Sequence, residues 1–177
     1  MIGAAKLQPA IYEEVEADKG ALGQAAGVVV LAAIAAGIGV LGGGFGLFIG
    51  TIIAALVGWV VWAVITWVIG TKLLPEPQTE ADIAQMLRTI GFSASPGLLR
   101  VFGIIPVIGW LVVIIANIWM LIAMIIGVRQ ALDYKSTGRA VAVCIIGFIV
   151  EIIIMAVIFS LLGPDVASMP AGNPGPI

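Results

Sequence analysis

The sequence predicts an all-α integral membrane protein: a bundle of five transmembrane helices, the third short and interrupted by proline, with two amphipathic helices on the inside surface. The first observation is composition, because 62% of the 177 residues are hydrophobic and only 10% are charged. In soluble domains about a quarter of the residues are charged. The second observation is a series of apolar runs, each close to the roughly 20 residues that a helix needs to cross a bilayer. The third is that basic residues gather between alternate runs.

The composition also excludes several classes of function. A net charge of -2 without a basic patch argues against a nucleic-acid partner. With no histidine and one cysteine, Cys144 in an apolar run, we expect no metal site, no cofactor and no disulfide. The chain has no nucleophile elbow, no phosphate-binding loop and no pair of intramembrane carboxylates, so we expect no catalytic residues.

Residues 1–20 are predicted to form a cytosolic amphipathic segment. Four acidic residues outnumber two lysines there, which does not fit the basic start of a signal peptide. Residues 8–19 favour a short helix, because Pro9 suits a first turn and Ile11 and Val15 share one face. We expect this helix to lie at the membrane surface or to dock on the bundle.

The first two spans are predicted at residues 21–41 and 47–70, joined by a tight glycine-rich turn. At 1.5 Å per residue the first run gives a helix of roughly 31 Å, enough for a hydrocarbon core of about 30 Å. Small residues recur along its flank in steps of four or eight, so we expect a close helix–helix approach on that side. These small residues are Gly23, Gly27, Ala35, Gly39 and Gly43.

A proline-rich linker over residues 71–78 precedes a second amphipathic helix at 79–90. Thr79 is the expected N-cap, and the apolar stripe that starts at Ile83 and ends at Ile90 has helical spacing. This helix is expected to lie on the membrane surface or to lead into the third span.

The third span, at residues 92–108, is the difficult crossing of the chain. It contains Pro96, Arg100 and Pro106, and a central arginine costs roughly 2.5 to 3.5 kcal/mol on insertion scales. Each proline also removes a backbone hydrogen-bond donor. We therefore expect the other spans to surround this segment.

The fourth and fifth spans are predicted at residues 110–128 and 140–162. Counted from the ends of the predicted helices, Glu151 in the fifth span and Arg100 in the third both lie near the middle of the membrane. Because isolated charges are costly at that depth, we expect Arg100 and Glu151 to form an ion pair, or each to find a polar partner. The candidate partners are Asn117, Thr66 and a carbonyl freed beside Pro106.

The distribution of basic residues favours an inside N-terminus and five spans. Apart from Arg100, every lysine and arginine then lies inside, and the Pro/Gly tail at residues 163–177 lies outside. A re-entrant loop at residues 91–109 would instead leave four spans and would move Arg129, Lys135 and Arg139 outside. The short loops and the lack of targeting signals favour a bacterial cytoplasmic membrane.

Several short stretches carry a resemblance to a known family. They are Glu14-Val15 with Asp18, the stretch 21–24, Gly91-Phe92-Ser93 with Pro96, Gly127-Val128-Arg129 and the stretch 136–140. Over about residues 9–162 the chain resembles the Yip-domain membrane proteins.

This resemblance implies five spans and a cytosolic N-terminus. Eukaryotic members are associated with Rab GTPases and vesicle traffic, but this chain lacks their long cytosolic N-terminal region. It resembles the short prokaryotic branch, which implies no defined activity. The positions matched to the family as structural determinants are Gly91, Pro96, Arg129, Ser136, Thr137 and Arg139.

Taken together, these features predict a non-catalytic membrane protein that acts by binding, as a membrane-organising adaptor or an accessory subunit of a larger complex. The expected partners are the lipid bilayer and other membrane subunits or further copies of the chain. An inside face built from residues 8–19, 79–90 and 129–139, together with Pro106 at the end of the third span, is the expected structural and docking framework. The alternative is a small transporter or channel that uses Arg100 and Glu151.

Overall fold

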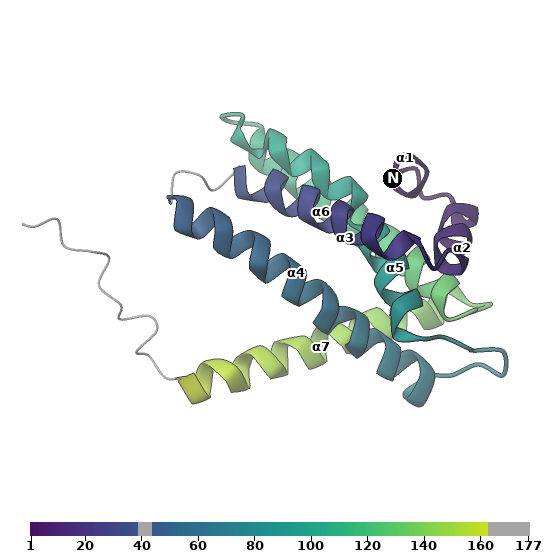
Figure 1. The fold of residues 1–177 in the computed structure, drawn as a ribbon. Coiled ribbons are helices and arrows are strands. Elements are labelled where there is room, and N and C mark those ends of the chain that lie inside the picture. The colour runs from purple at the N-terminus through teal and green to yellow at the C-terminus, as the bar shows by residue number, and fades with distance from the viewer. Residues whose placement is uncertain (39–43, 163–177) are drawn as a thin grey trace, which may run out of the picture.

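The computed structural model describes residues 1–38 and 44–162, which form helices joined by short loops (Figure 1). The predicted packing positions Gly39 and Gly43, and the tail at 163–177, lie outside the described residues. The helices are α1 (Ile2–Ala5), α2 (Pro9–Ala17), α3 (Ala21–Ile38), α4 (Phe45–Val68) with its π-helical continuation η2 (Ile69–Leu73), α5 (Ile83–Ser93), the 3₁₀-helix η3 (Ser95–Ile104), α6 (Gly109–Ala131) and α7 (Thr137–Leu162).

Within the described residues, four helices are long and apolar enough to cross a membrane. They cover Ala21–Ile38, Phe45–Leu73, Gly109–Ala131 and Thr137–Val157, and they match the first, second, fourth and fifth predicted spans. Residues 9–20, 69–82 and 131–139 lie toward one end of the bundle, called here the polar end (Figure 1). The loop between η3 and α6 lies at the opposite end, as does the start of α4.

The third predicted span differs from the structure in both its limits and its form. The segment begins at Ile83 and combines α5 with η3, so the helix expected at 79–90 and the span expected at 92–108 are parts of one rod. The N-cap is Asp82 rather than Thr79: Asp82 Oδ1 accepts from the backbone N–H of Gln85 at 2.7 Å. The Thr79 hydroxyl instead accepts from the backbone N–H of Glu76 at 2.9 Å.

Pro96 accounts for the change of helix type along this rod. It occupies the first turn of η3 and is buried, and a proline there removes a donor that an α-helix would need. At rises of about 1.5 Å and 2.0 Å per residue, α5 and η3 together extend over roughly 36 Å. Pro106, expected inside the span, lies exposed in the loop that follows η3, and its carbonyl accepts from the N–H of Ile108 at 2.9 Å.

The α5–η3 rod occupies the centre of the bundle. Both α3 and α6 contact α5 and also contact η3, and α4 contacts α3, α5 and α7. Gly91 permits a close approach of the rod to α3, because a Cβ at this position would lie 2.8 Å from the Cβ of Ala25 and 3.1 Å from its carbonyl oxygen. The difficult segment is therefore surrounded by other helices, as its composition requires.

The glycine flank predicted on α3 is not the face through which this helix packs. Gly23 and Gly27 are exposed, and a Cβ at either position would meet nothing within 4 Å. The packed face is instead lined with alanine and valine, and it includes Ala35 of the predicted set. Its members are Ala21, Ala25, Val28, Val29, Ala32, Ala33 and Ala35.

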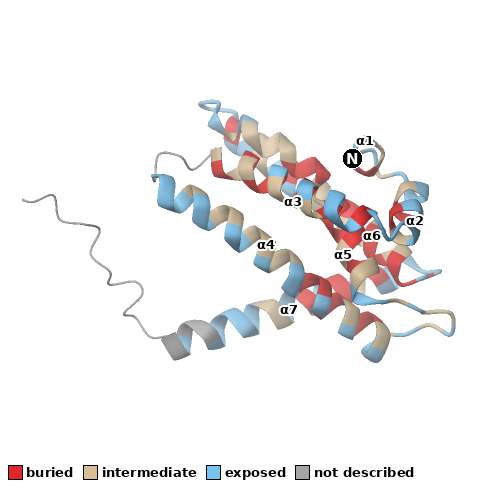
Figure 2. Cartoon of the chain, in the orientation of Figure 1, coloured by how far each residue is buried: buried red, intermediate tan, exposed pale blue. Residues whose placement is uncertain are grey.

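Helix α2 docks on the bundle at the polar end, against α5 and α6. Tyr12 and Val15 are buried, and the Tyr12 hydroxyl donates to the carbonyl of Ala4 at 3.0 Å. Buried residues gather where α2, α5 and α6 meet, whereas α4 and α7 are largely exposed toward the opposite end (Figure 2).

The contrast between two glycines gives a test of this packing. Gly91→Ala should lower the free energy of unfolding by about 1–3 kcal/mol, because the new methyl group collides with the backbone of α3. Gly27→Ala should change it by less than about 1 kcal/mol, in the stabilising direction, because alanine favours a helix and the site is open. Thermal unfolding in detergent measures both, and equal shifts in Tm would contradict this packing.

Candidate functional site

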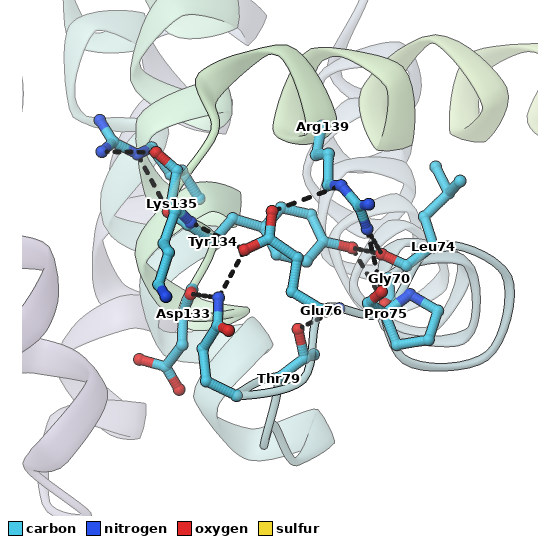
Figure 3. Close-up of polar contacts among 11 residues, drawn as sticks. Gly70, Leu74, Pro75, Glu76, Thr79, Asp133, Tyr134, Lys135 and Arg139 are labelled. Carbon is cyan, nitrogen blue, oxygen red and sulfur yellow. Dashed lines mark hydrogen bonds and ion pairs between the residues drawn. The ribbon is translucent and has the colours of Figure 1, made fainter.

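A polar cluster joins two loops at the polar end, the one between η2 and α5 and the one between α6 and α7 (Figure 3). Tyr134 is its centre, because its hydroxyl lies 2.9 Å from the carbonyl oxygen of Gly70 and 2.7 Å from that of Leu74. Burial raises the pKa of Tyr134 to about 12, so the phenol remains a hydrogen-bond donor at physiological pH. The π-helical turn of η2 is thus held by a residue of the other loop.

Arg139 and Glu76 add an ion pair to this cluster. Arg139 Nε lies 3.3 Å from Glu76 Oε1, and its Nη1 donates to the carbonyl of Pro75 at 2.9 Å. The second carboxylate oxygen of Glu76 accepts from the backbone N–H of Lys135 at 3.2 Å. That hydrogen bond is the main reason why the pKa of Glu76 falls below its ordinary value, and the charges of Arg139 and Lys135 act in the same direction.

Arg129 closes the α6–α7 loop from the other side. Its Nε donates to the carbonyl of Tyr134 at 3.2 Å, and its Nη2 donates to that of Lys135 at 3.3 Å. Ser136 and Thr137 are exposed at the start of α7, where the Ser136 carbonyl accepts from the N–H of Arg139 at 3.2 Å. Of the positions matched to the family, Arg129 and Arg139 therefore support loops through carbonyl groups.

Sequence reasoning missed Tyr134 and Glu76, which complete this cluster. Their signal is an aromatic residue within a polar loop and an acid between two prolines. Neither pattern specifies a partner in another loop.

Arg88 anchors α2 to the rod at the same end of the molecule. The side chain is 4% exposed; its Nε donates to the carbonyl of Val15 at 3.0 Å, and its Nη2 donates to that of Glu16. Gln85 Nε2 donates to Glu16 Oε1 at 3.1 Å. Burial, with the nearby charge of Asp133, raises the pKa of Glu16 to about 7, although Arg88 acts in the opposite direction.

Arg100 and Glu151 both line a cavity of about 270 Å³ between the helices, but the predicted ion pair between them is wrong. Salt-bridge contacts among the described residues join Arg139 to Glu76 and do not include this pair. Arg100 instead donates through Nε to the carbonyl of Gly97 at 3.2 Å and through Nη2 to that of Ala32 at 3.1 Å. The carbonyls are therefore those of η3 and α3, not one beside Pro106.

The other polar partners suggested for this pair are engaged or placed elsewhere. The Thr66 hydroxyl donates within its own helix, to the carbonyl of Trp62 at 2.8 Å. Asn117 is exposed on α6 and does not line the cavity.

The raised pKa of Glu16 predicts a pH-dependent docking of α2. Between the ordinary value of 4.5 and about 7 the folded state binds a proton that the unfolded state has released, so stability falls as pH rises through this window. Amide exchange of α2, corrected for its intrinsic pH dependence, should show less protection at about pH 8 than at about pH 5. Glu16→Gln should remove this difference, because its carbonyl can still accept from Gln85.

The matched control is Glu14→Gln, which changes an exposed acid on the same helix. It should keep the pH dependence of the unmodified protein. If Glu16→Gln also kept it, the burial of Glu16 would not be its cause.

Comparison with known proteins agrees with this architecture. The family model of the Yip1 domain matches residues 10–159, from α2 to near the end of α7. No curated protein and no solved structure matches the chain significantly. Because the family match covers most of the sequence, the chain is a multi-pass membrane protein that belongs to the Yip1 domain family.

Proposed function

We propose that this protein is a non-catalytic membrane protein that acts by binding, as an adaptor or an accessory subunit of a larger membrane complex, through its polar end. The observation that carries the proposal is the cluster around Tyr134, Glu76 and Arg139, which ties two loops into one surface. Loops without such ties would lose more conformational entropy on binding.

The exposed charges around this cluster suit a protein partner. Glu80, Asp133 and Lys135 are exposed and carry both signs. A hollow of about 340 Å³ at the same end is lined by Glu13, Arg129, Gln130, Asp133, Tyr134 and Lys135. Such mixed charge favours specific orientation of a complementary partner over general attraction to an anionic membrane surface.

The proposal includes five crossings, with the polar end and the N-terminus inside and the C-terminus outside. The α5–η3 rod supplies the third crossing, since the part beyond Arg88 still extends over roughly 29 Å, close to the thickness of a core of about 30 Å. The path of the chain supports this, because η3 leads away from the polar end and α6 returns to it (Figure 1). The inside lysines and arginines support the orientation.

Cysteine labelling tests the number of crossings. In a Cys144→Ser background, Val107→Cys places a thiol at a position that is 86% exposed in the η3–α6 loop, and Ser136→Cys places one at the polar end. With five crossings, a membrane-impermeant maleimide should label position 107 in intact cells and position 136 only after permeabilisation. The reverse pattern would contradict the proposed topology, because it is expected both for four crossings with a re-entrant third segment and for five crossings in the inverted orientation.

Capture of the intact assembly tests the binding function. The protein, extracted from its native membrane in mild detergent and weighed by native mass spectrometry, should retain a stoichiometric protein partner. Charge reversal by Lys135→Glu with Glu80→Lys should lower the captured fraction by roughly tenfold or more, because like charges then face each other across the interface.

The control is Lys19→Glu, which reverses an exposed charge at the polar end outside the cluster. It should leave capture unchanged. A protein that appears alone or only as a homo-oligomer, and is indifferent to both substitutions, would refute docking through this surface.

A further inference from the structure

The cavity lined by Arg100 and Glu151 contains polar groups that binding at the polar end does not use. Its walls come from α3, α4, α5, η3, α6 and α7, and they are apolar except at Ser93, Arg100 and Glu151. The volume of about 270 Å³ lies just below the roughly 300–1,000 Å³ of small-molecule sites. It suits a small amphiphile or the polar end of a longer one.

The arrangement of α4 and α7 places this cavity within reach of the bilayer. The two helices cross where Trp62 packs on Phe148, with ring centroids 4.6 Å apart. From this crossing they diverge toward the end of the bundle opposite the polar end (Figure 1). Ala55, Gly58 and Glu151 line the cavity on the diverging part, and the cavity is partly open to the surface.

The polar groups of the cavity lack full partners within the protein. The hydrogen bonds of Arg100 go to neutral carbonyls, which leaves the guanidinium without a counter-charge in direct contact. In the part of the chain that the structure describes, the Glu151 carboxylate accepts no hydrogen bond and joins no ion pair. Such groups are costly in an apolar medium unless a ligand compensates them.

We propose that this cavity binds a neutral, single-chain lipid with a hydroxyl head, its chain against the apolar walls and its hydroxyl between Arg100 and Glu151. The two side chains balance each other in charge, so a charged headgroup would leave a net charge in hydrocarbon. A hydroxyl both accepts from an N–H group and donates to a carboxylate. The small volume favours one chain over two.

Photo-crosslinking tests this site on the full protein in phosphatidylcholine nanodiscs. The probe is hexadecanol that carries a diazirine in its chain, and the labelled peptides should come from α4 and α7 around Gly58 and Glu151. Unlabelled hexadecanol should compete roughly tenfold better than palmitate, because the carboxylate of palmitate adds an unbalanced charge.

Two substitutions in α4 distinguish labelling inside the cavity from labelling on the lipid-facing surface of the bundle. A Cβ at Gly58 or at Gly50 meets nothing within 4 Å, but only Gly58 lines the cavity. Gly58→Leu should fill the space and abolish labelling, whereas Gly50→Leu should leave it intact. Equal labelling of the two variants would show that the probe labels only the lipid-facing surface of the helices. That result would overturn the proposal.

Glu151→Gln tests the charge balance without changing the size of the side chain. It leaves Arg100 uncompensated, so palmitate should now compete at least as well as hexadecanol. If palmitate already competes equally in the unmodified protein, or if Glu151→Gln leaves the order of competition unchanged, a site selective for a neutral headgroup is refuted.

Discussion

The structure depends on one constraint, that polar groups inside a bilayer are costly unless they have partners, most of which the protein itself must supply. The α5–η3 rod contains most of the polar groups concerned, since it holds a half-buried arginine, Arg100, a proline and hydroxyl side chains. Arg100 donates to the carbonyl of Ala32, and the Ser93 hydroxyl lies 3.1 Å from the carbonyl of Ala123. These contacts reach α3 on one side and α6 on the other. The rod therefore occupies the centre, and the simpler apolar helices pack around it.

The same arrangement gives the two ends of the bundle different properties. At the polar end, Tyr134 and Arg139 tie the loops to each other and Arg88 fixes α2. Toward the opposite end α4 and α7 separate, and Glu151 faces a space bordered by other helices. The proposed protein-binding surface and the proposed lipid-binding cavity thus belong to different parts of one fold.

The candidate sites were only partly accessible from the sequence. Arg129 and Arg139 stood out as basic residues in a polar loop, and Arg100 and Glu151 stood out as charges within apolar runs. Their partners did not, because each contact joins segments far apart in the chain. Arg139 pairs with Glu76, and Arg100 reaches Ala32 across 68 positions. A backbone carbonyl, in particular, leaves no mark in the sequence that identifies it as an acceptor.

The sequence by itself determined the helical membrane architecture, the positions of the four long apolar helices and the irregularity at Pro96, because hydrophobicity and the missing N–H of proline are local properties. Only the tertiary structure decided which faces pack. Apart from Gln24, helix α3 is apolar on every side, so its pattern did not show that alanines rather than Gly23 and Gly27 meet the neighbouring helices. The rotation of each helix about its axis depends on how well its surface fits that of its neighbour, as at Gly91 against Ala25. This fit depends on both helices together, so the sequence of one helix does not reveal it.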